Sequence, residues 1–163
     1  MRLNLGCGDK MRAGDWLNIF RRGLPAKGHQ FLRADIRNLQ GFVHDGVVDE
    51  ILAWDVLEHM PRSDAECVLG EIHRVLKPGA QVEFKMPEIG LLLAWSQGRD
   101  HREVSFRWYG QHDVDPHWMY PQNVHQYVWA KDNFIQVVIK RGFRFVESEA
   151  CEETNMRYRF VKE

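Results

Sequence analysis

The sequence predicts an α/β fold: a mostly parallel sheet with helices on both faces and an antiparallel hairpin at its C-terminal end. Short apolar segments typical of strands alternate with longer connections along most of the 163 residues, and parallel strands need such connections. Near the C-terminus, two strand-like segments are separated only by a polar stretch, Cys151 to Asn155. A chain of this length has room for one domain, so we expect residues 1–163 to form a single domain.

Three strands are expected near the N-terminus. They are Leu3 to Leu5, Trp16 to Phe20 and Phe31 to Ile36, and the sequence Gly6-Cys7-Gly8 directly follows the first of them. Two glycines there let the backbone turn tightly and approach a ligand, although an ordinary strand-ending turn would have the same pattern. Binding of NAD is disfavoured, because Met11 stands where the third glycine of a G-x-G-x-x-G motif would fall.

The middle of the chain is predicted as strand, helix and strand. Ile51 to Val56 and Gln81 to Met86 have the apolar character of buried strands. Between them, apolar residues recur at helical spacing from Ala65 to Leu76. Ser63 with Glu66 matches a capping box at the start of this helix.

The last part of the chain is predicted as a helix followed by a strand hairpin. The helix covers Asn133 to Arg141, and the strands cover Phe143 to Glu149 and Met156 to Lys162. In the second strand apolar residues alternate with arginines, which is typical of a strand with one buried face. The preceding segment, residues 98–131, is rich in His, Trp, Tyr and Asp and lacks clear periodicity, so we expect a lid or acceptor-binding insertion there.

Composition excludes several classes of function. Lys and Arg number 22 against 23 Asp and Glu, so no general attraction to nucleic acid or to an anionic membrane is expected. Three cysteines without paired spacing predict neither a disulfide framework nor a structural zinc site. The first residues lack a signal segment, and we expect a cytoplasmic protein. The longest apolar run, Leu91 to Trp95, fits either a core helix or an exposed interface, so a homodimer is one alternative.

Four stretches of the sequence resemble, in order and spacing, the class I S-adenosylmethionine (SAM) methyltransferases of the small type-11-like group. They are LNLGCGDK, ADIRNL, DEILAWDVLEHM and EIHRVLKPGAQVEFKMPE. WYGQ, His125 and KRGF resemble the C-terminal pattern of small members associated with sugar or cell-surface polymer pathways. The resemblance covers nearly the whole chain. It implies a Rossmann-like fold, SAM as cofactor, and methyl transfer to a small-molecule acceptor such as a sugar or polymer precursor.

The resemblance also implies a cofactor site around the first glycine loop. The backbone of Gly6, Cys7 and Gly8 would lie against the methionine part of SAM, with Asn4 on the adjoining strand. Cys7 is then a small loop residue and not a reactive thiol.

The remaining cofactor contacts would follow the second, third and fourth strands. Asp35 would contact the adenine amino group with Ile36 beside the ring, and Asp55 would contact cofactor or acceptor; both aspartates could instead stabilise loops. Relatives end the second strand with an acid that binds the ribose hydroxyls, whereas this chain has Phe20. An alternative function is therefore a binding or assembly subunit that keeps the fold but uses SAM weakly or not at all.

Methyl transfer from a sulfonium is a direct displacement, so the protein must chiefly align the acceptor, and a base is needed only if that acceptor carries a proton. His59 and His125 are the candidates for this catalytic base. A structural hydrogen bond at a strand end is the alternative for His59, and both roles stay open for His125. No metal site is predicted, because His101, His112 and His117 lack a compact ligand motif.

Overall fold

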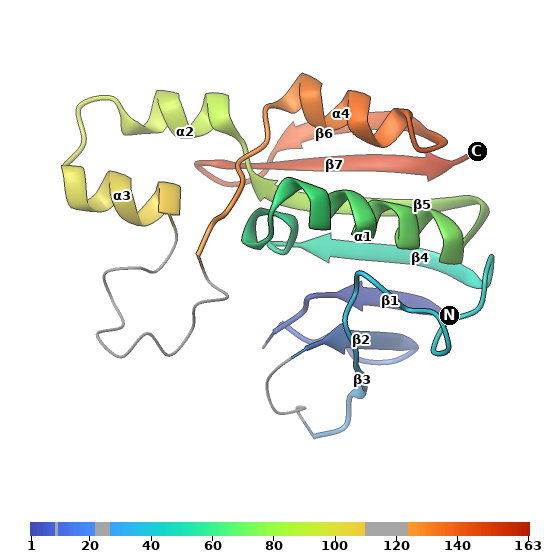
Figure 1. Ribbon diagram of the computed structural model, residues 1–163. Helices are drawn as coiled ribbons and strands as arrows, with labels where there is room; N and C mark the ends of the chain where they lie inside the picture. The colour runs from blue at the N-terminus through green and yellow to red at the C-terminus, as the bar shows by residue number, and fades with distance from the viewer. Residues whose placement is uncertain (9, 22–26, 110–123) are drawn as a thin grey trace.

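The computed structural model describes residues 1–8, 10–21, 27–109 and 124–163. Its strands form one seven-stranded sheet in the order β3-β2-β1-β4-β5-β7-β6 (Figure 1). In chain order the elements are β1 (Arg2–Leu5), β2 (Trp16–Phe20), β3 (Gln30–Arg33), β4 (Val48–Trp54), the 3-10 turn η1 (Leu57–His59), α1 (Arg62–Val75), β5 (Leu76–Pro87), α2 (Ile89–Ser96), α3 (His101–Tyr109), α4 (Lys131–Ile139), β6 (Phe143–Ala150) and β7 (Asn155–Lys162).

The strand directions confirm the predicted sheet. β1 pairs in parallel with β2 and β4, β2 with β3, and β4 with β5. β7 runs antiparallel to both of its neighbours, β5 and β6, so the C-terminal hairpin places its second strand inside the sheet. Both chain ends consequently lie at the edge where the parallel strands begin, and the carboxyl ends of those strands are left to the loops (Figure 1).

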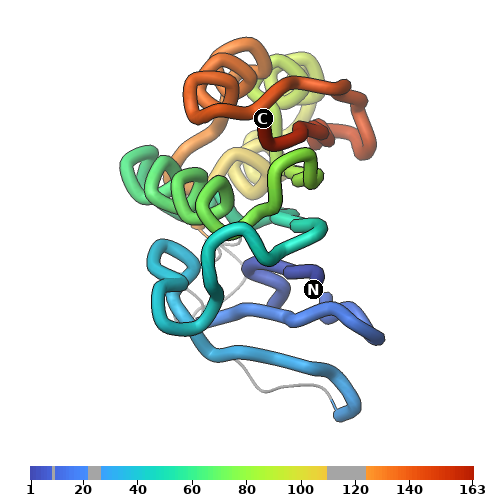
Figure 2. The backbone as a smooth tube through the Cα atoms, turned by 90° about the vertical axis from the view of Figure 1, so that its right-hand side faces the viewer, coloured from blue at the N-terminus to red at the C-terminus, as the bar shows by residue number. Residues whose placement is uncertain are grey.

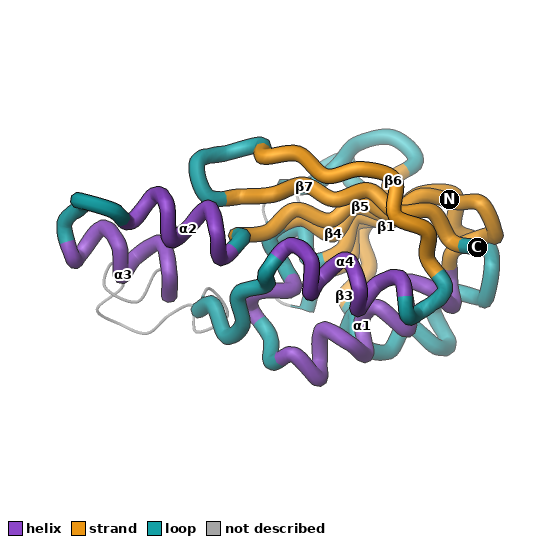
Figure 3. Tube along the Cα trace, turned by 90° about the horizontal axis from the view of Figure 1, so that it is seen from above, coloured by secondary structure: helices purple, strands orange, loops and turns teal. Residues whose placement is uncertain are grey.

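Helices α1 and α4 pack on the same side of the sheet (Figures 2 and 3). Val82, Phe84 and Met86 of β5 belong to the apolar core on this side, and each is fully buried. The ring of Phe134 from α4 packs edge-on against Phe84, with centroids 5.2 Å apart. One continuous core therefore joins the sheet to these two helices.

The opposite face of the sheet carries polar side chains beside apolar ones, and no helix of the described residues packs on it. It carries the buried side chains of Asn4, Asn18, Glu83 and Lys85, which alternate along their strands with core residues. The fold class is confirmed, whereas the expected helices are found on one face only within the described ranges. We call this second side the helix-free face.

A loop takes the place of a helix over part of the helix-free face. The Asn4 amide donates to the carbonyl oxygen of Lys10 at 3.0 Å and to Asn18 Oδ1 at 2.9 Å. Asn18 Oδ1 accepts from the backbone N–H of Arg12 at 2.7 Å, and the Asn18 amide donates to the Arg12 carbonyl at 2.8 Å. Two asparagines on adjacent strands thus fix residues 10–12 against the sheet.

Local boundaries differ from the sequence predictions in identifiable ways. The capping-box prediction is wrong: α1 begins one residue before Ser63, its N-cap is Pro61, and no side chain caps it. Pro61 has φ −57°, a value that its ring already fixes. Glu66 instead bonds to Arg62 at 2.9 Å and, through its other oxygen, to Arg141, just after α4, at 2.9 Å.

Two further segments were placed only approximately by the sequence. β3 ends at Arg33 and not at Ile36, because the chain leaves the sheet and buries Ile36 in the core. The segment expected as an irregular insertion contains α3 and, beyond it, residues 110–123, which lie outside the described residues. Leu92 and Trp95 of α2 are buried while Leu93 is 55% exposed, as in a helix with one core-facing side.

Candidate functional site

The glycine loop after β1 lies at the carboxyl edge of the sheet. Gly6 and Gly8 have φ of +62° and +51°, values that favour glycine. A Cβ on Gly6 would lie 2.3 Å from Cγ2 of Val56, whereas a Cβ on Gly8 would meet nothing within 4 Å. Gly6 therefore allows close packing against the turn after β4, and Gly8 borders open space into which a ligand could approach.

A pocket of about 260 Å³ lies beside this loop on the helix-free face. This volume is below the roughly 300 to 1,000 Å³ typical of small-molecule sites, so it would take part of a cofactor-sized ligand. The guanidinium of Arg12 lies over the Trp54 ring, 4.7 Å from its centroid. The residues lining the pocket are Asn4, Cys7, Lys10, Met11, Arg12 and Trp54.

Asn4 and Cys7 border the pocket in different ways. The Asn4 amide is occupied by the loop and by Asn18, so Asn4 shapes the site by holding the glycine loop. Cys7 is buried, and its thiol lies 3.8 Å from the Gly8 carbonyl. Cys7 is thus a buried loop residue, and its expected contact with the cofactor stays a prediction.

Asp55 links the ends of β4, β5 and β7. It has φ of 52°, the one positive value outside glycine among the described residues, and such backbone outliers concentrate at functional sites. Its carboxylate accepts from Lys85 at 2.8 Å, Lys10 at 3.2 Å and Asn155 at 3.3 Å. Lys85 also bonds to Glu152 at 2.9 Å. Asp55 is thus held in a charged network beside the glycine loop.

Asp35, the expected adenine contact, is already bound by arginine. Nε and Nη2 of Arg37 donate to its two oxygens at distances from 2.6 to 3.1 Å, and Nη1 of Arg37 reaches Asp64 at 2.6 Å. Hydrogen bonds from Arg37, together with its charge, lower the pKa of Asp35 to about 2. An adenine amino group would have to share this carboxylate with Arg37.

Phe20 and Ile36, two expected cofactor contacts, are both buried. Phe20 is only 3% exposed, and its ring stacks on Phe31 with centroids 5.9 Å apart. Ile36 belongs to the core. At the end of β2 the chain therefore has the buried Phe20 ring, stacked on the 44% exposed Phe31, where the family resemblance leads us to expect a carboxylate. Ribose hydroxyls would need acceptors from elsewhere.

The structure brings His59 and His125 together, although 65 residues separate them in the chain. Their ring centroids are 5.1 Å apart. The backbone carbonyl of Glu58 accepts from the N–H groups of Gln126 and Tyr127 at 2.7 and 3.2 Å, which holds the returning segment against η1. The glycine loop is close as well, since Val56, the residue that Gly6 contacts, is the N-cap of η1.

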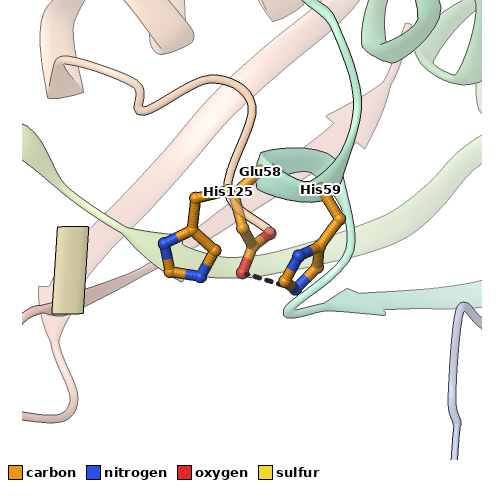
Figure 4. A group of neighbouring side chains, drawn as sticks. All are labelled: Glu58, His59 and His125. Atoms are coloured by element: carbon orange, nitrogen blue, oxygen red, sulfur yellow. Dashed lines mark ion pairs between the residues drawn. The ribbon is translucent and has the colours of Figure 1, made fainter. Parts of the chain in front are cut away.

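Glu58 joins the two histidines as a buried acid that the sequence analysis did not single out (Figure 4). Its Oε1 lies 3.9 Å from Nε2 of His59. Burial raises the pKa of Glu58 to about 8, with a smaller contribution from the charge of Asp55. Burial, followed by the charge of His125, lowers the pKa of His59 to about 4. At neutral pH the acid is therefore protonated and His59 is neutral.

A signal for Glu58 was present in the sequence. It lies in the LEHM motif directly before His59 and, like the histidine, follows a buried strand. Acidic residues are rarely buried without a partner, so its burial depends on the returning segment 124–127, which sequence periodicity does not position.

Comparison with known proteins concerns the fold. Residues 9–84 match the methyltransferase domain family. Among curated proteins, none matches the sequence. The fold resembles that of a SAM-dependent methyltransferase from Methanosarcina mazei, with a TM-score of 0.70 and 15% identity over 99% of this chain and 91% of that one.

Two other solved structures are similar. The 1,6-didemethyltoxoflavin-N1-methyltransferase of Burkholderia thailandensis, with S-adenosylhomocysteine bound, has a TM-score of 0.67 and 15% identity over 99% of this chain and 70% of that one. A complex of the Trm112 methyltransferase activator with a methyltransferase from Haloferax volcanii has a TM-score of 0.67 and 14% identity, covering 98% and 81%.

The chain has the class I methyltransferase fold. The resemblance stated from the sequence is confirmed at the level of family match and fold. No helix in the described part of this methyltransferase-fold chain is long and apolar enough to span a membrane. The roles expected for individual residues stay predictions.

Proposed function

We propose that this chain binds SAM at the carboxyl edge of its sheet and transfers the methyl group to a small-molecule acceptor, such as a sugar or a cell-surface polymer precursor. The observation that carries the proposal is the juxtaposition of the glycine loop with His59 and His125. Gly6 packs on Val56, the residue that begins η1, so cofactor loop and histidine pair belong to one edge. Ligands in open α/β sheets bind at this edge.

SAM would supply an electrophilic methyl group. The backbone of Gly6 and Gly8 would allow its close approach, and Asp55 would hold the adjoining loops through Lys10 and Lys85. A hydroxyl acceptor would lie near the two histidine rings. Neutral His59 can accept a hydrogen bond from that hydroxyl, but its lowered pKa makes it a weak base, so it acts mainly by orienting the acceptor.

Cytoplasmic function as a monomer or homodimer fits this proposal, with no nucleic-acid or membrane partner required. One structural neighbour is complexed with a protein activator, so a partner subunit would be compatible with an active enzyme. The alternative from the sequence, a binding or assembly subunit with lost SAM use, receives no support from the comparisons. The buried Phe20 ring still argues for modest SAM affinity.

Titration calorimetry with SAM and S-adenosylhomocysteine tests the cofactor half of the proposal. Gly8→Val should weaken SAM binding at least about tenfold, because a side chain would fill the space where the ligand approaches. Gly46→Val is the matched control: Gly46 also has a positive φ, +61°, and open space at its Cβ, but lies before β4, away from this edge. Equal affinities of the two variants would refute the assigned site.

A further inference from the structure

Glu58, His59 and His125 form a compact set of possible metal ligands. One ligand atom from each residue lies within 4.8 Å of the other two. The Glu58 carboxyl group lies between the two imidazole rings (Figure 4). Two histidines and one carboxylate, with further positions open, are a recurrent ligand set for divalent transition metals.

The backbone around the cluster sets the protonation of both rings. Nδ1 of His59 lies 3.3 Å from the carbonyl oxygen of Val124, and Nδ1 of His125 lies 3.2 Å from that of Trp108. A carbonyl oxygen can only accept, so each neutral ring carries its proton on Nδ1 and keeps a lone pair on Nε2. Metal-binding histidines characteristically donate the N–H of their second ring nitrogen to a carbonyl in this way.

Glu58 adds an independent observation. Glu58 is 1% exposed, and its Oε2 is buried without a hydrogen-bond partner among the described residues. A buried polar atom without a partner costs free energy. A bound cation would remove this cost and would also explain why an acid lies between two imidazoles.

We propose that Glu58, His59 and His125 bind a divalent transition-metal ion, with Zn²⁺ the best match to two imidazoles and a carboxylate. Bonds of about 2.0 to 2.2 Å hold ligand atoms within roughly 4 Å of each other, so the three side chains need to draw together only slightly. The sequence predicted no metal site because the histidines of the 98–131 segment lack a motif. The fold instead assembles ligands from η1 and from residue 125.

A metal here would leave coordination positions for water or for an acceptor hydroxyl. A hydroxyl bound to Zn²⁺ loses its proton far more readily than a free one. With Nε2 of His59 bound to the ion, the ion would take over the role of orienting the acceptor hydroxyl. This consequence rests on the proposed methyl transfer, whereas metal binding itself does not.

Titration of the full chain with Co²⁺, followed by visible absorbance, and with Zn²⁺, followed by calorimetry, tests the site. We expect one ion per chain and a Co²⁺ spectrum without thiolate charge-transfer bands. Glu58→Gln keeps the side-chain shape but removes a ligand charge, and it should lower metal affinity at least about a hundredfold. Changing residues that only hydrogen-bond to metal ligands already costs roughly 10- to 100-fold, and Glu58 would be a ligand itself. His125→Gln gives a second variant at a partly exposed position, should Glu58→Gln not fold.

His44→Gln and Cys67→Ser are the controls, because both residues are exposed and lie outside the cluster. Both should bind the metal as the parent does. A parent chain that binds neither ion, or folded Glu58→Gln and His125→Gln variants that bind as tightly as the parent, would overturn the metal site. SAM titration of the metal-free chain in parallel separates this outcome from failure of the proposed function, which does not require the ion for cofactor binding.

Discussion

On β5, Phe84 points into the core beneath α4, while the preceding residue, Glu83, points to the helix-free face. Phe84 is fully buried and packs against the rings of Phe134 and Phe160. Glu83 is also buried, but accepts hydrogen bonds from Trp54 Nε1 at 2.9 Å and Arg159 Nε at 2.8 Å. One strand is thus stabilised by apolar burial on one side and by paired charges on the other.

The comparison shows how a largely parallel sheet can dispense with one helical layer. Such sheets are usually apolar on both faces because helices cover both. Here Arg157 and Arg159 on β7 surround Glu83 and also reach Glu149 and Glu147 on β6. The charged side chains cover the strands in place of helices, and their long apolar stems can bury part of the sheet surface.

The largest effect on stability is expected on the covered face, the side of the sheet on which α1 and α4 pack. Phe84→Ala should lower the free energy of unfolding by about 3 to 5 kcal/mol, because it removes a fully buried ring and leaves a cavity among aromatic neighbours. Urea denaturation measures the change. Val146→Ala on β6, where the residue is 45% exposed, should change it by at most about 0.5 kcal/mol. Similar losses in both variants would mean that the aromatic cluster does not dominate stability.

A smaller effect is expected one residue earlier on the other face. Glu83→Gln keeps an acceptor for Trp54 but removes the charge that Arg159 and Arg157 share. We expect a loss of about 1.5 to 2 kcal/mol, the lower part of the roughly 1.5 to 3 kcal/mol range for hydrogen bonds involving charged groups. The partial exposure of the two arginines, 28% and 33% of their side chains, keeps the loss at this level.

Glu149→Gln is the control for this second prediction. Glu149 pairs with Arg157 at 2.8 Å but is 55% exposed, and exposed ion pairs contribute roughly 0 to 1 kcal/mol. Urea denaturation should therefore separate the two variants clearly. If Glu149→Gln costs as much as Glu83→Gln, burial is not what makes the helix-free face stable.

The sequence predicted the strands themselves, because alternation and apolar runs are local properties. In β7 the alternation of arginines with apolar residues already indicated one polar face. The partners of Glu83 could not be predicted, since they come from β4 and β7 and depend on strand order. α3 was missed for a related reason: none of its residues is buried, so it has no apolar stripe that periodicity could detect.

The site was predicted in part. The sequence selects His59 because it follows the fourth strand, and His125 through the family resemblance; the structure places them side by side. Glu58 was missed because the segment that hydrogen-bonds to its backbone carbonyl, Gln126 and Tyr127, comes from far along the chain. The engagement of Asp35 was missed although Arg37 is only two residues away, because a neighbour in sequence does not reveal which way its side chain turns.

The smallest effect on stability is expected at Asp35, which belongs to a partly exposed ion pair. Its carboxylate binds Arg37, which also bonds to Asp64 in the first turn of α1, so the pair ties the loop after β3 to the covered face. Unlike Glu83, Asp35 is 35% exposed and Arg37 is 38% exposed. Solvent screening should therefore limit the loss in Asp35→Asn to less than about 1 kcal/mol at neutral pH.

The pH dependence distinguishes this electrostatic loss from a packing defect. The folded-state pKa of Asp35, about 2, lies below its ordinary value of 3.8, chiefly because of hydrogen bonds from Arg37. A depressed carboxyl pKa stabilises the fold above the unfolded value, and this contribution disappears as the pH falls through the folded value. Parent and Asp35→Asn should therefore differ at pH 7, and their urea midpoints should converge between about pH 4 and pH 2. A difference that stays constant down to pH 2 would assign the loss to packing.

SAM titration of the same variant adds a second measurement. If Asp35 binds adenine, Asp35→Asn should weaken SAM affinity out of proportion to its small effect on stability. Unchanged affinity would leave Asp35 as a structural partner of Arg37.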